Sequence, residues 1–203
     1  MDKKLSEIYN EFAETYEKNR GLFDMTDIFS SFYEILDMPK GELLDLGCGA
    51  GEPFPRLFIN KGWEVTGVDF SEKMLELAQK YVPEMKTIHS DITNIKFEEN
   101  NFDAITAIYS LFHIENKKHK NLFENLYKWL KPNGKILFTY ATKDYTKSEE
   151  FNGYKEFMGQ KLFYSHKKPN DLYQMLEETG FTIISKNYKN IGGEVFLWLI
   201  LSK

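Results

Sequence analysis

Short runs typical of strands alternate with helical segments through the middle of this 203-residue chain, and this alternation limits the folds open to it. The runs lie at 43–46, 63–68, 86–89, 102–109 and 135–140. Helical periodicity fills most of the intervals between them. Repeated strand–helix–strand units form a parallel sheet whose two faces are covered by helices. We therefore predict an α/β fold built on such a sheet.

Both ends of the chain depart from this alternation. Residues 1–40 predict two helices, because apolar side chains recur every three or four residues and the second helix stops before Pro39. Near the other end, a helix over 169–179 stops at Gly180. Strands follow at 181–188 and 194–201, and the turn between them predicts a hairpin. The last strand should therefore run antiparallel to the strand before it.

Composition excludes several classes of protein. Lys and Arg number 26 and Asp and Glu 31, which gives a net charge of −5. The densest basic run, 117–120, is short and is interpreted as a solvated helix start, so we predict no nucleic-acid partner. The apolar stretch 195–201 is too short to span a bilayer, and no signal peptide is recognised, so no membrane partner and a cytoplasmic location are expected. Cys48 is the single cysteine and the four histidines are scattered, so no metal site is predicted.

A glycine-rich loop, 47–51, follows the first apolar strand. Glycines there allow a ligand to approach the backbone amides, and the ligand crevice of an open α/β sheet lies at the carboxyl ends of its strands. The dinucleotide fingerprint needs a sixth-position glycine, but this loop has Glu52, which would repel a pyrophosphate. The spacing therefore disfavours NAD. A ligand with cationic centres suits Asp45 and the other acids better.

Two acidic residues end the next strands. Asp69 closes the second strand, where a carboxylate can accept both ribose hydroxyls. Asp91 follows the third strand and can meet an adenine amino group. Taken alone, each acid is more often a solvated loop residue or a helix cap. Together with the glycine loop, at successive strand ends, they form a strong signal.

Four segments resemble the motifs of class I S-adenosylmethionine-dependent methyltransferases. Residues 43–51 (LLDLGCGAG) resemble the donor-binding motif, and 68–71 with Met74 resemble the ribose motif. Residues 90–92 resemble the adenine motif, and 130–135 the turn before the fifth strand. The resemblance covers roughly residues 5–203 and is closest to the broad type 11/type 25 methyltransferase group. Asn133 departs from the usual glycine, which affects a turn and not the site.

The resemblance implies a Rossmann-like, doubly wound, seven-stranded sheet, mostly parallel with an antiparallel last strand. It implies S-adenosylmethionine as methyl donor and S-adenosylhomocysteine as product. The chain would be one methyltransferase domain, with 1–40 as a helical cap, 41–140 as the donor-binding core and 141–203 on the acceptor side. The expected donor-binding residues are Tyr16, Asp45, Gly47, Gly49, Gly51, Asp69, Phe70, Met74, Asp91 and Ile92.

Two histidines are candidates for catalysis. His113 follows the fourth strand, in a segment that lies beside the transferable methyl in the resembling group, so it can deprotonate or orient an acceptor. The alternative is a histidine packed against the next helix. His166 reaches the same region by analogy, and its alternative is a loop residue at a helix start. His89 and His119 are interpreted as structural or exposed.

The remaining acceptor side is described only loosely by the sequence. Glu194 opens the last strand and can bind a cationic acceptor, although blunting an exposed edge is the preferred interpretation. The polar segment 143–153 is a mobile lid or an ordinary loop.

The predicted function is methyl transfer to an oxygen or nitrogen of a small-molecule acceptor. No Asn-Pro-Pro-Tyr or Asp-Pro-Pro-Tyr segment occurs, the signature seen in amino methylation of nucleobases and glutamine. The acidic balance points the same way. The alternatives are a protein or RNA methyltransferase and a non-catalytic S-adenosylmethionine-binding protein.

Overall fold

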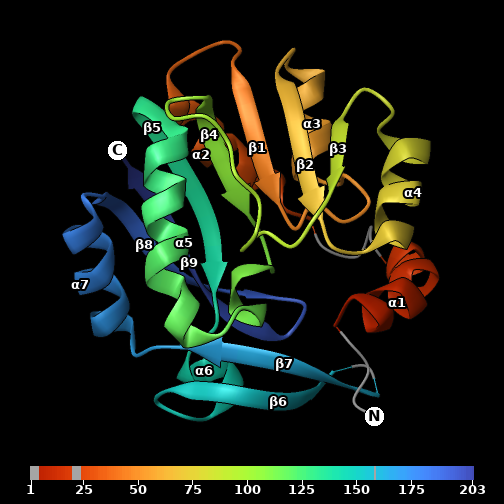
Figure 1. Ribbon diagram of the computed structural model, residues 1–203, viewed down its shortest axis with the longest axis vertical. Coiled ribbons are helices and arrows are strands. Elements are labelled where there is room, and N and C mark those ends of the chain that lie inside the picture. The colour runs from red at the N-terminus through yellow and green to blue at the C-terminus, as the bar shows by residue number, and fades with distance from the viewer. Residues whose placement is uncertain (1–4, 20–23, 158) are drawn as a thin grey trace. The chain divides into compact units, whose positions relative to one another are not determined.

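The computed structural model describes residues 5–19, 24–157 and 159–203, without the side chains of 14 and 16–19 (Figure 1). The chain divides into two compact units. The first runs to Ile95 and includes 104–106, and the second comprises 96–103 and 107–203. The single domain expected from the sequence remains a prediction. Among the described helices, none combines the length and apolar character needed to cross a membrane.

Seven strands form one sheet in the order β3-β2-β1-β4-β5-β9-β8. The pairs β1–β2, β1–β4 and β2–β3 are parallel, whereas β9 is antiparallel to both β5 and β8. The predicted Rossmann-like sheet with an antiparallel last strand is therefore confirmed. The strands are β1 Glu42–Leu46, β2 Glu64–Asp69, β3 Lys86–His89, β4 Phe102–Ala107, β5 Leu130–Tyr140, β8 Thr182–Ile191 and β9 Glu194–Ser202.

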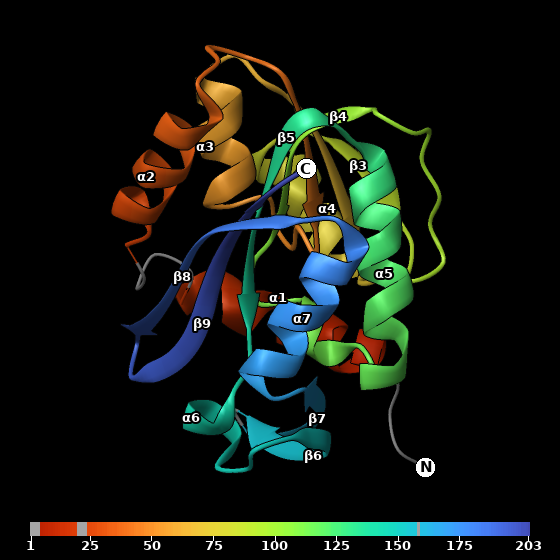
Figure 2. The same cartoon turned by 90° about the vertical axis from the view of Figure 1, so that its left-hand side faces the viewer.

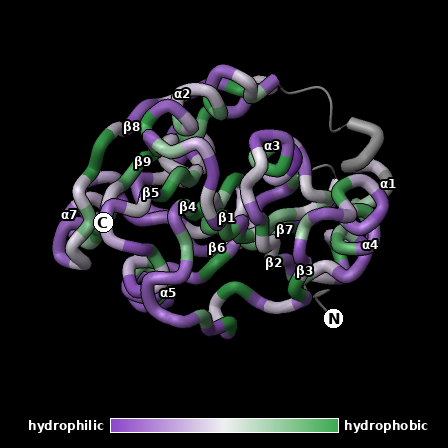
Figure 3. The backbone as a smooth tube through the Cα atoms, turned by 90° about the horizontal axis from the view of Figure 1, so that it is seen from above, coloured by the Kyte–Doolittle hydropathy of each residue, from purple (hydrophilic) through white to green (hydrophobic). Residues whose placement is uncertain are grey.

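Helices in the first unit pack through apolar and aromatic side chains. They are α1 Leu5–Asn19, α2 Thr26–Leu36, α3 Phe54–Asn60 and α4 Glu72–Tyr81. Figure 2 shows α2 beside α3, and the ring of Phe58 lies 5.2 Å from Phe29 and 4.9 Å from Trp63. Hydrophilic residues run along the outer turns of α1 and α4 (Figure 3). On α2 and α4 the apolar residues at helical spacing are the buried ones: Phe29, Phe32, Leu36, Met74, Leu75 and Ala78.

The second unit holds two longer helices and a small extra sheet. Its helices are α5 Asn116–Trp129, the single turn α6 Lys143–Thr146 and α7 Pro169–Thr179, and α7 ends at Gly180 in the left-handed region, φ 106°. Strands β6 Phe151–Phe157 and β7 Gln160–His166 pair antiparallel as a separate two-stranded sheet. The segment 143–153, expected as a lid or loop, is therefore α6 and the start of β6. The residues of β6 alternate between half-buried and exposed positions, but too many of them are polar for the sequence to predict a strand.

The turn expected before the fifth strand is also different. Strand β5 already begins at Leu130 and runs through residues 131–134, which were predicted as a turn. Asn133 takes φ 65°, a left-handed conformation that asparagine adopts more readily than most residues. This explains how asparagine replaces the usual glycine here. Gly134 has no such freedom, because a Cβ there would lie 2.8 Å from the Lys131 carbonyl oxygen.

Candidate functional site

The glycine loop is held against the end of β2. The amides of Gly47 and Cys48 both donate to the Val68 carbonyl, at 2.8 and 3.1 Å. Gly49 takes φ 51°, and a Cβ built on it would meet nothing within 4 Å. Gly51 takes φ 81°, and a Cβ there would lie 2.8 Å from Val82. Glycine is therefore required at 51 for packing, whereas at 49 it leaves open space beside the backbone.

Asp69 ties the glycine loop to the first residues after β2. One carboxylate oxygen accepts the amide of Gly49 at 2.9 Å, and the other accepts the amide of Ser71 at 2.8 Å. Burial raises the pKa of Asp69, and these backbone hydrogen bonds act in the opposite direction. Each carboxylate oxygen has a second lone pair. The side chain can therefore still accept hydroxyl groups, as expected of a ribose ligand residue.

Asp45 is the second buried acid of this unit. Its Oδ1 accepts the hydroxyl of Thr106 at 2.5 Å, and the two residues are register partners in β1 and β4. Burial, and secondarily the charge of Asp69, raise the pKa of Asp45 to about 7. Sequence reasoning missed Thr106. Its signal was a polar residue inside the buried run 104–107, next to an acid-bearing strand.

The remaining expected donor residues lie around these acids. Phe70 follows β2, and its ring lies 5.4 Å from Tyr9 of α1. Met74 is buried and donates its amide to Ser71, which caps α4. Asp91 is exposed and accepts the amide of Thr93 at 2.7 Å, and Ile92 beside it is buried. The side chain of Tyr16 lies outside the described residues.

The first unit thus brings Asp45, the glycine loop, Asp69 and Asp91 to the carboxyl ends of three neighbouring parallel strands. Two buried carboxyls whose pKa values are raised are costly to charge in the protein alone. A ligand that brings a cation and hydroxyl groups relieves this cost, and the open space at Gly49 lets it approach. The residues present therefore fit S-adenosylmethionine.

His113 belongs to the second unit, in a short 3₁₀ turn at Leu111–His113. Its Nδ1 lies 2.7 Å from the Phe163 carbonyl oxygen, which can only accept. Nδ1 therefore carries the proton, and Nε2 carries the lone pair. Burial lowers the pKa of His113 to about 4, so the imidazole is neutral at neutral pH.

His113 borders a group of packed rings, called here the aromatic cluster: Phe112, Tyr145, Tyr164 and Phe196. The His113 ring lies 4.8 Å from Tyr164, which stacks on Phe112 at 5.4 Å. Phe196 lies 5.1 Å from Phe112 and 4.6 Å from Tyr145. No sequence periodicity joins these rings, because they come from the 3₁₀ turn, α6, β7 and β9.

The other expected catalytic histidine has a different setting. His166 is the last residue of β7 and is buried, with Nε2 2.7 Å from the Thr146 hydroxyl and Nδ1 3.1 Å from the Lys167 carbonyl. His119 is buried as well, bonded to the Tyr140 hydroxyl and the Ile114 carbonyl. His166 therefore links β7 to α6, and His119 links α5 to β5 and to the segment before α5. Across the described residues, no group of three or more His, Cys, Asp or Glu side chains could hold a metal ion.

Comparisons with known proteins agree on one family. A family profile described as "Methyltransferase domain" matches residues 1–186. Phosphoethanolamine N-methyltransferase 3 of Arabidopsis thaliana is 31% identical over 84% of this chain and 34% of that protein. A tRNA N(3)-methylcytidine methyltransferase of Schizosaccharomyces pombe is 30% identical over 93% of this chain and 66% of that protein. The chain therefore spans about a third of the first relative and about two thirds of the second.

A solved structure shows the same fold. The 1,6-didemethyltoxoflavin-N1-methyltransferase of Burkholderia thailandensis, with bound 1,6-didemethyltoxoflavin and S-adenosylhomocysteine, superposes with a TM-score of 0.72 at 18% identity. The match covers 100% of this chain and 92% of that chain. At this identity the likeness concerns the fold alone.

Proposed function

The chain belongs to the methyltransferase domain family and is an S-adenosylmethionine-dependent methyltransferase, and from that premise we propose that it methylates an oxygen or nitrogen of a small organic acceptor. The observation that carries the acceptor proposal is His113, a neutral imidazole beside the aromatic cluster. Apolar rings with one oriented proton acceptor suit a small organic molecule.

In this proposal the residues of the first unit bind the methyl donor. S-adenosylmethionine, when bound, supplies an electrophilic methyl group on a sulfonium. Asp45 would stabilise the cationic part of the donor, Asp69 would accept the ribose hydroxyls and Asp91 the adenine amino group. Gly47, Gly49 and Gly51 would let the ligand approach the backbone. Phe70, Met74 and Ile92 would supply apolar contacts, and Tyr16 would close over the donor.

His113 acts on the acceptor in this proposal. The Phe163 carbonyl fixes the tautomer, so Nε2 accepts the proton that the acceptor hydroxyl or amine loses on methylation. The low pKa keeps the ring unprotonated throughout the neutral range. For His166, bonds at both ring nitrogens favour a positioning role, holding β7 against α6.

The test is release of S-adenosylhomocysteine from S-adenosylmethionine with panels of small alcohols and amines, a tRNA transcript and a protein extract. Release with a small molecule supports the proposal. Release with tRNA or protein alone would overturn it in favour of a macromolecular acceptor, the alternative that the yeast relative's name raises. Tight donor binding with no release from any acceptor would instead favour the non-catalytic alternative.

A further inference from the structure

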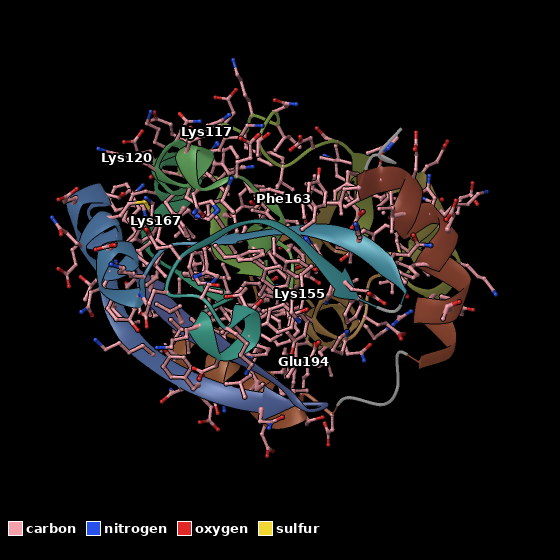
Figure 4. All side chains as sticks on the ribbon, turned by 90° about the horizontal axis from the view of Figure 1, so that it is seen from below. Lys117, Lys120, Lys155, Phe163, Lys167 and Glu194 are labelled. Carbon is pink, nitrogen blue, oxygen red and sulfur yellow. The ribbon has the colours of Figure 1, made fainter. Side chains whose placement is uncertain are left out.

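A cation already lies on one face of the aromatic cluster. The ammonium of Lys155, on β6, lies 3.9 Å from the centroid of the Tyr145 ring. A cation within about 6 Å of a ring centroid is attracted by the negative face of the ring. Figure 4 shows Lys155 in the same region as Glu194, which opens β9. This face of Tyr145 therefore accepts an alkylammonium group.

The ring that receives this ammonium is held rigidly. Tyr145 is 6% exposed, and its ring packs 4.6 Å from Phe196 and 5.2 Å from Tyr164. Lys155, by contrast, is half-buried on a hairpin strand and has a flexible four-carbon stem. A ligand can therefore replace the lysine ammonium without rearranging the rings.

Glu194 adds a carboxylate to the same place. Burial raises its pKa and the Lys155 charge lowers it, while burial together with the Glu194 charge raises the pKa of Tyr145 to about 12. Glu194 and Phe196 are two residues apart on β9, so both side chains leave the strand on the same face, where Phe196 packs 4.6 Å from Tyr145. Strand β9 pairs with β5 only from Leu197 onward, so Glu194 can blunt the unpaired edge of β9, as the sequence favours. That role does not explain why Glu194 interacts electrostatically with Lys155 and Tyr145.

We propose that Tyr145, Phe196 and Glu194 form a seat for an ammonium group of the acceptor, and that Lys155 occupies this seat until the acceptor displaces it. The inference rests on the proposed function and deepens it, because it assigns the acceptor to the class of small cationic amines. An aromatic face beside a carboxylate is the complement of an ammonium ion. A neutral molecule of the same shape has no comparable attraction to it.

Lys155 is then an internal competitor. The apparent affinity of a ligand falls in proportion to the fraction of protein molecules in which Lys155 occupies the seat. Removing the lysine charge should tighten the binding of a cation, whereas removing the Glu194 charge should weaken it. A merely structural Lys155 would move cation and neutral affinities together.

The experiment titrates tetramethylammonium, and tert-butanol as a neutral probe of similar shape, into the full chain saturated with S-adenosylhomocysteine, followed by NMR. Tetramethylammonium should bind about tenfold more tightly than tert-butanol. Lys155→Gln should tighten tetramethylammonium by about three- to tenfold, and Glu194→Gln should weaken it by a similar factor. The matched controls Lys161→Gln and Glu156→Gln, exposed register partners on the same hairpin, should change neither probe. Circular dichroism verifies that each variant folds.

Two outcomes would overturn the seat: equal affinity for both probes, or weaker tetramethylammonium binding in Lys155→Gln. The proposed function fails separately. If the cation binds as expected but no acceptor releases S-adenosylhomocysteine, the seat stands and the transfer proposal falls. If neutral alcohols are methylated without cation preference, the transfer proposal stands and the seat falls.

Discussion

Replacing Asp45 by asparagine should make the donor-free protein more stable at alkaline pH. The side chain is 4% exposed, and its pKa rises from the ordinary 3.8 to about 7. Charging it therefore costs the folded protein about 4 kcal/mol more than the unfolded chain, at about 1.4 kcal/mol for each pH unit. Asparagine is nearly isosteric and can still accept the Thr106 hydroxyl. Its buried amide N–H group can lack a partner, which costs about 1–3 kcal/mol of stability.

The sign follows from the two protonation equilibria. The unfolded chain loses the Asp45 proton above pH 3.8, whereas the folded protein keeps it to about pH 7. The contribution to stability is fully present below pH 3.8 and is lost as the pH rises through 7. Between pH 5.5 and 8.5 the wild type should therefore lose about 2 kcal/mol relative to Asp45→Asn. At pH 8.5 the free energy of unfolding of the variant should exceed that of the wild type by about 1–3 kcal/mol. Each kcal/mol should raise Tm by about 2–4 °C.

Urea unfolding of both proteins at pH 5.5, 7.0 and 8.5, without donor, measures this difference. Asp91→Asn is the matched control, because Asp91 is exposed and its charge is solvated. A stability difference for Asp45→Asn that stays constant with pH, or a variant less stable at pH 8.5, would refute the reasoning. The proposed donor role adds a second readout, since the same variant should bind S-adenosylmethionine more weakly at pH 8.5.

Four further predictions use other parts of the structure. Asp69→Ala should raise the dissociation constant of S-adenosylhomocysteine at least about tenfold by calorimetry, because it loses two hydrogen bonds to a charged acceptor. His113→Ala should leave that constant nearly unchanged and lower turnover by about 10²–10⁴-fold, and the reverse pattern would contradict the assigned roles. Tyr140→Phe should destabilise the protein by about 1–3 kcal/mol in urea, because His119 and the amide of Lys167 lose their shared hydroxyl partner; an unchanged midpoint would contradict this. Burial lowers the pKa of His119 to about 4, so its contribution to stability is complete above pH 6.5 and is lost as the pH falls toward 4. His119→Asn should therefore lose less stability than the wild type as the pH falls from 6.5 to 4. Parallel plots of stability against pH for the two proteins would refute this role of His119.

The donor side was accessible from the sequence because its determinants are local. A glycine loop directly follows β1, and Asp69 ends β2 as expected. The carboxyl ends of parallel strands meet at one edge of the sheet, so chain position alone predicts which residues become neighbours. Ser71, which caps α4 by accepting the Met74 amide, also acts through residues close in sequence.

The acceptor side was not accessible in this way. The aromatic cluster joins rings from elements far apart in the chain, and three of its members, Phe112, Tyr145 and Tyr164, lie on elements that the sequence does not predict. The β6–β7 hairpin has no strong apolar alternation, since β6 alternates only between half-buried and exposed residues and β7 is buried at three successive residues near its end. Pairing between strands, not local pattern, stabilises it.

What the sequence determined by itself was the parallel sheet, the succession of its strands and helices along the chain, and the acids placed at successive strand ends. These follow from periodicity and spacing, which are properties of neighbouring residues. Only the tertiary structure decided that Asp45 is buried against Thr106, that the Phe163 carbonyl orients His113, and that Lys155 lies over Tyr145. Burial and charge contact depend on residues distant in sequence, and these set pKa values and ligand preference.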